Sequence, residues 1–310
     1  MTQKTVRSFS CFALLVGALM LMSATALAQY PIGSSHISDM KPGSVLFYSR
    51  YSSNPANPAM GDTQINITNV SQNTATNVHL FMVDGATCSI ADSFVGLTPN
   101  QTASFLVSDF DPGITGYIVA VATNGGPTQF NNLIGSEYIR ETNGTTAYLQ
   151  AIGVAKRSAG PAGTDGSGQT VLNFNGVDYE QLPSVLAVDA FNSQSSDTNY
   201  LSIFSPPNDL TIGGAVSASI FTLLYNDAEV AISSSFTVNC YRYESFVSLF
   251  NRGGGINRHV PSGRTGWIRL SSSSRPILGS VFGKGPVFTG GHNLHAIQLL
   301  GSYSITVPSF

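Results

Sequence analysis

Charged side chains are scarce in this sequence. Lys and Arg together number 14 and Asp and Glu 17, so charged residues make up 10% of the chain, against about a quarter in typical soluble domains. No cluster of basic residues occurs, and the formal net charge is only -3. A nucleic-acid-binding surface needs a concentrated positive patch. We therefore expect no nucleic-acid partner.

Long apolar runs are absent beyond residue 28. Near the start, Lys4 and Arg7 precede an apolar stretch at 9–22, and Ala26-Leu-Ala28 fits the cleavage rule of a secretory signal peptide. An uncleaved membrane anchor is the alternative, but the run is short for a span. The sequence predicts a signal peptide at 1–28 and a secreted, cell-surface or periplasmic protein without a transmembrane segment after cleavage.

Cysteine is also rare. Cys11 falls within the predicted signal, so only Cys88 and Cys240 remain in the mature chain. Export to an oxidising compartment permits a disulfide between them, and two separate buried thiols are the alternative. Two cysteines are too few for a disulfide-dense mini-domain or a zinc cluster.

No helical stripe of useful length is present. Instead, short segments such as 63–70, Thr-Gln-Ile-Asn-Ile-Thr-Asn-Val, alternate polar and apolar residues, which is typical of half-buried strands. Gly, Ser, Thr and Asn replace the missing charged residues, and turn signals recur about every ten residues. The pattern predicts an all-β protein built from antiparallel β-sandwiches.

Two phrases recur in the same order in both halves of the chain. The phrase Thr-Gly-aromatic-Ile occurs at 115–118 and 265–268, and a second apolar phrase containing Gly-Ser occurs at 133–138 and 277–282. The matched order indicates an internal duplication. Tyr117 and Trp267 should then occupy equivalent places.

A stretch rich in Gly, Ser, Pro and Ala, residues 156–168, separates the two copies. Such a composition cannot bury apolar surface and is typical of a linker. We therefore predict two tandem immunoglobulin-like β-sandwich domains, at 29–155 and 169–310, joined by this linker.

Catalytic motifs are missing. There is no Gly-x-Ser-x-Gly nucleophile elbow, and no His lies in a recognisable catalytic setting. Pairs of carboxylates for glycoside cleavage remain open because their spacing in sequence is free. The mature chain has few glutamates to supply them, namely Glu137, Glu141, Glu180, Glu229 and Glu244. We expect no enzymatic activity and no cofactor.

Metal-binding candidates are few. His292 and His295 have metal-like spacing, but residues three apart on one strand point to opposite faces, and no acidic partner lies nearby in sequence. Asp109 and Asp111 share a face if extended and could supply oxygen ligands to calcium, although no complete calcium-loop pattern is present. An Asp before Pro-Gly is more often a turn former. These two residues are weak calcium candidates.

The phrases at 64–69, 78–85, 97–102 and 115–118 resemble a group of uncharacterised secreted bacterial proteins with immunoglobulin-like or fibronectin-like modules. The resemblance covers residues 44–154 and reaches the second half only through the internal repeat. It implies export and a β-sandwich, and it implies no activity.

These features predict an exported, non-enzymatic structural or interaction protein with an adhesion-like role at the cell surface or outside the cell. Its partner would be a protein or a glycan. The alternative is a secreted carbohydrate-binding module or carbohydrate-active enzyme. A row of exposed aromatic side chains on one sheet face would favour the carbohydrate partner.

Overall fold

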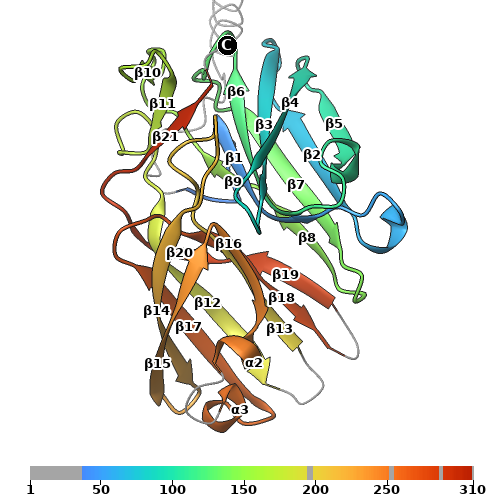
Figure 1. Ribbon diagram of the computed structural model, residues 1–310, viewed down its shortest axis with the longest axis vertical. Coiled ribbons are helices and arrows are strands. Elements are labelled where there is room, and N and C mark those ends of the chain that lie inside the picture. The colour runs from blue at the N-terminus through green and yellow to red at the C-terminus, as the bar shows by residue number, and fades with distance from the viewer. Residues whose placement is uncertain (1–36, 194–197, 251–254, 286–288, 309–310) are drawn as a thin grey trace, which may run out of the picture. The chain divides into compact units, whose positions relative to one another are not determined.

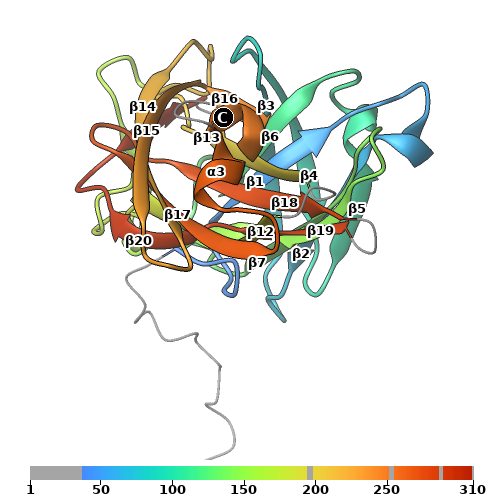
Figure 2. The ribbon, with the colours of Figure 1, turned by 90° about the horizontal axis from the view of Figure 1, so that it is seen from below.

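The computed structural model describes residues 37–193, 198–250, 255–285 and 289–308. Their strands form five antiparallel sheets, which Figure 1 shows and Figure 2 presents from below. The helices in this part of the chain are single turns: η1 (Pro58–Met60), η2 (Val107–Asp109), α2 (Phe246–Leu249) and α3 (Ile256–His259). The predicted signal peptide at 1–28 lies outside the described residues.

A five-stranded sheet of order β4-β3-β6-β1-β9 organises the first half. Its strands are β1 (Val45–Ser52), β3 (Thr76–Asp84), β4 (Ile90–Leu97), β6 (Thr115–Thr123) and β9 (Ile152–Val154). β1 and β6 are buried along nearly their whole length because other sheets cover both of their faces. This is why their sequences are almost continuously apolar instead of alternating.

Two smaller sheets cover this central sheet. Leu46 and Ile118 face the four-stranded sheet β5-β2-β7-β8, whereas Phe47 and Val119 face the three-stranded sheet β10-β11-β21. The strands of the four-stranded sheet are β2 (Thr63–Asn69), β5 (Thr102–Leu106), β7 (Leu133–Arg140) and β8 (Thr146–Gln150). Those of the three-stranded sheet are β10 (Gly163–Thr164), β11 (Thr170–Asn173) and β21 (Ser304–Val307).

The second half forms a five-stranded sheet of order β15-β14-β17-β12-β20 and a four-stranded sheet of order β16-β13-β18-β19, with an apolar core between them. The strands of the first are β12 (Pro183–Ser193), β14 (Ser217–Asn226), β15 (Ala231–Asn239), β17 (Arg264–Ser272) and β20 (His295–Leu299). Those of the second are β13 (Thr198–Phe204), β16 (Tyr241–Ser245), β18 (Leu278–Lys284) and β19 (Thr289–Asn293).

The two Thr-Gly-aromatic-Ile phrases begin β6 and β17. β6 lies between β3 and β1, and β17 lies between β14 and β12. Both pairings shift register at the same point, between the glycine and the isoleucine of the phrase. A Cβ atom on Gly116 would lie 1.8 Å from the carbonyl oxygen of Val83. Close backbone approach therefore requires glycine at this position.

The prediction of two tandem immunoglobulin-like β-sandwich domains is wrong, although the all-β class is confirmed. The described residues belong to one compact unit, in which the five small sheets are arranged in the manner of a five-bladed β-propeller. One core cluster crosses the halves, since the rings of Tyr117 and Phe204 stack with centroids 4.0 Å apart. The prediction of an internal repeat, in which one self-contained sandwich is used twice, is also wrong, because the two halves share this core cluster.

Residues 156–168, predicted as a linker, carry ordered contacts. Lys156 is buried and donates hydrogen bonds to the carbonyl oxygens of Ser158 and Gly160. β10 then pairs with β11, which pairs with the last strand, β21. The stretch therefore contributes to the sheet that covers the face of Phe47 and Val119.

Helices capable of crossing a membrane do not occur in the part of the chain that the structure describes.

Candidate functional site

The sheet β5-β2-β7-β8 presents one face away from the core. In β2, Ile65 and Ile67 point into the core, so Gln64, Asn66 and Thr68 lie on the opposite, partly exposed face. The register places Ser136 and Ser104 on either side of Asn66. We call this surface the polar face; its members are Gln64, Asn66, Thr68, Thr102, Ser104, Ile134, Ser136, Tyr138, Tyr148 and Gln150.

Two tyrosines dominate one end of the polar face. Tyr138 on β7 and Tyr148 on β8 are directly opposite in the register. Their side chains are 37% and 57% exposed, respectively. Tyrosine combines a flat apolar ring with a polar tip. The two rings therefore offer neighbouring apolar surfaces among hydrogen-bonding groups.

Hydrogen bonds hold the centre of the polar face in place. The Ser136 hydroxyl accepts from the Tyr148 hydroxyl at 2.8 Å and from the Asn66 amide at 3.2 Å. The carbonyl oxygen of the same amide accepts from the Ser104 hydroxyl at 2.7 Å and from Gln64 Nε2 at 3.1 Å. A ligand that binds here meets side chains already ordered, which lowers the entropic cost of binding.

A shallow groove of about 270 Å³ runs along the polar face. Asn66, Thr68, Thr102, Ile134, Ser136, Tyr148 and Gln150 are among the residues that line it. None of these lining residues is charged. The arrangement can stack an apolar ring surface on tyrosine and exchange hydrogen bonds with hydroxyls, but it holds no ionisable pair for acid–base chemistry.

Glu137 lies on β7 between two polar-face residues, yet its side chain points into the protein and is fully buried. One of its carboxyl oxygens accepts from the Ser49 hydroxyl at 2.9 Å and from the Ser49 backbone N–H at 3.2 Å. Burial raises the pKa of Glu137 to about 8, although the hydrogen bonds from Ser49 and the charge of Arg50 oppose the shift. Its inaccessibility separates this carboxyl from any ligand on the face.

Three of the other glutamates form ion pairs in separate places. Glu141 pairs with Arg50 at 2.6 Å, while Glu180 pairs with Lys41 and Glu244 with Arg242. Glu229 occupies a tight turn with φ 61°. No two of these carboxyl groups flank the groove.

The calcium candidates Asp109 and Asp111 have partners within the protein. Asp109 Oδ2 accepts from the backbone N–H of Leu106 at 3.2 Å, and Asp111 Oδ2 accepts from the Tyr51 hydroxyl at 2.5 Å. Burial raises the pKa of Asp111, while the Tyr51 hydrogen bond opposes the rise. Within the described ranges, no group of three or more His, Cys, Asp or Glu residues is arranged to hold a metal ion.

His292 and His295 have no acidic partner nearby in sequence, but the fold brings the distant Asp189 beside both rings. Their Nε2 atoms lie 2.9 and 3.5 Å from the two carboxyl oxygens of Asp189. On one continuous strand the two rings would point to opposite faces, but 292–295 is not one continuous strand. β19 ends at Asn293 and β20 begins at His295, so the break between them allows both rings to turn toward the same carboxylate.

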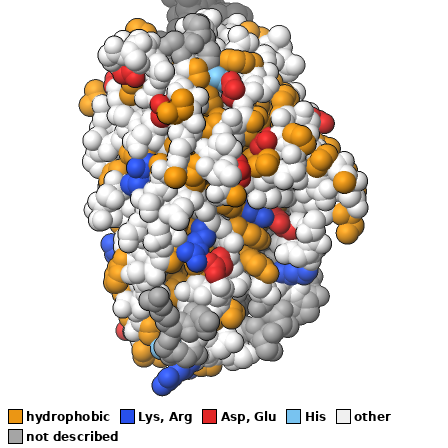
Figure 3. All heavy atoms as spheres, in the orientation of Figure 1, with side chains coloured by type: hydrophobic (Ala, Val, Ile, Leu, Met, Phe, Trp, Pro, Cys, Tyr) orange, Lys and Arg blue, Asp and Glu red, His pale blue; other side chains and the backbone are white. Residues whose placement is uncertain are grey.

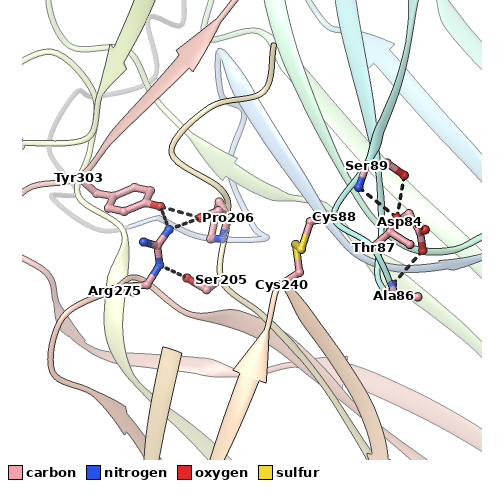
Figure 4. Close-up of a disulfide and its surroundings, with 10 residues drawn as sticks. All are labelled: Asp84, Ala86, Thr87, Cys88, Ser89, Ser205, Pro206, Cys240, Arg275 and Tyr303. Carbon is pink, nitrogen blue, oxygen red and sulfur yellow. Dashed lines mark hydrogen bonds between the residues drawn. A yellow bond between two sulfur atoms is a disulfide. The ribbon is translucent and has the colours of Figure 1, made fainter. Parts of the chain in front are cut away.

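Cys88 and Cys240 form a disulfide with a Cα–Cα distance of 5.9 Å (Figure 4). Cys88 follows the turn of Asp84, Ala86 and Thr87, and Cys240 precedes β16. Both residues have positive φ, 62° and 68°. The bond therefore ties together two turns from opposite halves of the sequence within the shared core.

The tyrosine pair was not anticipated from the sequence, although a signal for it exists. Residues 146–150, Thr-Ala-Tyr-Leu-Gln, alternate outward and inward, with Ala147 and Leu149 buried. That alternation alone places Tyr148 on a solvent-facing side. The pairing of Tyr148 with Tyr138 required the strand register.

No family model and no curated protein matches this chain. Two solved structures were found, both of a lectin from Pleurotus ostreatus. The apo form has 10% sequence identity and a TM-score of 0.16, and the match covers 91% of this chain and 84% of the lectin. The complex with GalNAc has 11% identity and a TM-score of 0.11, with 88% and 90% covered. At these TM-scores the likeness carries no argument about fold or function.

Proposed function

We propose that this is an exported, non-enzymatic interaction protein that adheres to glycans through the polar face. The observation that carries the proposal is the exposed Tyr138–Tyr148 pair beside an ordered array of amides and hydroxyls. A pyranose ring presents apolar C–H groups on its faces and hydroxyls around its edge. Tyrosine rings can pack on the former, and the Asn66 and Gln150 amides can bond to the latter.

The electrostatics of the groove favour an uncharged saccharide. Its lining contains no Lys, Arg, Asp or Glu, and charged side chains are few and scattered on the side of the molecule seen in Figure 3. A sialylated or sulfated glycan would lose hydration without gaining a cationic partner in the groove. Neutral oligosaccharides are therefore the expected ligands.

Two features support export and a binding role instead of catalysis. A disulfide between Cys88 and Cys240 suits an oxidising compartment outside the cytosol. The groove is open, and the buried Glu137 behind it cannot reach a bound sugar. Binding at an open face without hydrolysis is what an adhesion-like protein requires.

The test is a glycan array probed with the purified mature chain, followed by titration of the best ligand. Tyr148→Ala should weaken binding at least about tenfold, in the range found for truncating exposed aromatic anchors. Phe221→Ala, which removes a 47% exposed aromatic from a different sheet, is the matched control and should leave affinity unchanged. Equal affinities for wild type and Tyr148→Ala, or hydrolysis of the bound glycan, would refute the proposal.

A further inference from the structure

A second cavity, of about 300 Å³, shares no lining residue with the groove of the polar face. It is bounded by the chain at 37–39, by Ile152 of β9, and by residues of the β18 and β19–β20 regions. Most of its wall is hydrocarbon, supplied by side chains that include Ile37, Ile152, Leu186, Leu278 and Leu294. A cavity of this size with apolar walls and a few polar groups is typical of a small-molecule site.

Asn293 supplies an unsatisfied acceptor at the polar end. Its amide nitrogen donates to Asp39 Oδ2 at 3.1 Å and to the carbonyl oxygen of Gln150 at 2.7 Å. Two acceptors around the nitrogen fix the orientation of the amide, because the flipped amide would place oxygen against oxygen. The side-chain oxygen of Asn293 is buried and has no hydrogen-bond partner among the described residues. Buried polar atoms are normally hydrogen-bonded, so we expect a bound molecule to donate a hydrogen bond to this oxygen.

Asp39 adds negative charge to the same end. A carboxylate offers about four acceptor positions, and the hydrogen bond from Asn293 occupies one of them. His295, the basic side chain among the lining residues, directs its Nε2 toward Asp189, 3.5 Å away. The polar end therefore combines a carboxylate with an amide oxygen and needs hydrogen-bond donors and positive charge from its occupant.

We propose that this cavity binds a small primary amine carrying an apolar group. A protonated amine brings three N–H donors and one positive charge, which matches the Asp39 carboxylate and the Asn293 oxygen. The apolar group would then pack against the hydrocarbon wall. The site is distinct from the polar face and does not depend on glycan binding.

Calorimetric titration at neutral pH with three probes of one shape tests the proposal. Benzylamine carries the required charge, benzyl alcohol is its neutral analogue, and benzoate is anionic. Benzylamine should bind at least about tenfold more tightly than benzyl alcohol, and benzoate should not bind. Asp39→Asn should lower benzylamine affinity at least about tenfold and leave that of benzyl alcohol unchanged, because it removes the charge and keeps the shape. Asp165→Asn, at an exposed turn, is the control and should change nothing.

Three outcomes would overturn the proposal: no binding by benzylamine, equal binding by all three probes, or an Asp39→Asn variant with wild-type affinity. If Asp39→Asn does not fold, Ala296→Phe decides the question. Ala296 is exposed on β20 and lines the cavity, so a larger side chain can fill the space without disturbing the core. It should abolish benzylamine binding, and retained binding would locate the amine elsewhere.

Discussion

The hydroxyl of Ser49 lies 2.9 Å from a carboxyl oxygen of Glu137 and 2.8 Å from the hydroxyl of Ser280. All three residues are buried, and Ser280 comes from the second half of the chain. A hydroxyl has one proton, so Ser49 can donate to only one of these neighbours at a time. A protonated Glu137 can supply the second proton, which agrees with the upward shift of its pKa by burial.

Glu137 should make the protein less stable as the pH rises. Its pKa is about 8 in the folded protein against an unperturbed 4.5, so the folded state holds a proton that the unfolded state has lost between those values. The contribution of Glu137 to the free energy of unfolding is fully present below pH 4.5 and is lost as the pH rises to about 8. The slope from this group cannot exceed about 1.4 kcal/mol per pH unit.

Urea unfolding measured from pH 5 to pH 9 checks this expectation. Glu137→Gln mimics the protonated carboxyl, and its free energy of unfolding should decline less steeply across this range than that of the wild type. Parallel curves for the two proteins would mean that Glu137 is ionised in the fold throughout.

Gly116→Ala should be strongly destabilising. The added methyl group would lie 1.8 Å from the carbonyl oxygen of Val83, a backbone atom in the centre of a sheet. We expect a loss of at least about 3 kcal/mol, measured by chemical denaturation. Gly290→Ala is the matched control in a strand, because nothing lies within 4 Å of its added Cβ. Similar losses for both variants would show that general strand flexibility, and not the close approach, is responsible.

The strands were largely predictable, but the way the sheets stack was not. Alternation in 63–70 identifies β2 and its core-facing Ile65 and Ile67 directly. The continuous apolar run of β1 shows that both faces are covered, yet it does not say by what. The three-stranded sheet over Phe47 combines 163–173 with the last strand, and pairing across more than a hundred residues leaves no local trace in sequence.

The candidate sites were likewise predictable only where local sequence patterns determine them. Tyr148 is placed by local alternation, whereas its partner Tyr138 depends on register. The Asp189–His295 contact depends on the strand break at Leu294 and on a partner that lies far away in the sequence. The cavity at Asn293 is formed by segments spread between residues 37 and 296, so composition could not reveal it.

The Cys88–Cys240 bond should contribute substantially to stability. It closes a separation of 152 residues in the sequence, and cross-links that close long loops restrict the unfolded chain most. We expect reduction to lower the free energy of unfolding by about 2–5 kcal/mol, as measured by urea denaturation with and without reductant. The double variant Cys88→Ala, Cys240→Ala should be equally destabilised and insensitive to reductant. Unchanged stability after verified reduction would contradict the expectation.

Among the described charged residues, substitution of Arg50 should lower the free energy of unfolding the most. Its side chain is 5% exposed, its Nε lies 2.6 Å from Glu141 Oε1, and its guanidinium lies 3.5 Å above the ring of Tyr243. Arg50→Met should cost about 3–5 kcal/mol, because it leaves the Glu141 carboxylate buried without its partner. Adding Glu141→Gln should recover part of the loss, and a double-mutant cycle on the free energy of unfolding measures the coupling.

The exposed pair Arg264–Asp227, at 3.1 Å, is the control. Arg264→Met should cost less than about 1 kcal/mol. Additive effects at Arg50 and Glu141 would show that the cost of Arg50→Met comes from the lost contacts with Tyr243 and Tyr241 and not from the ion pair.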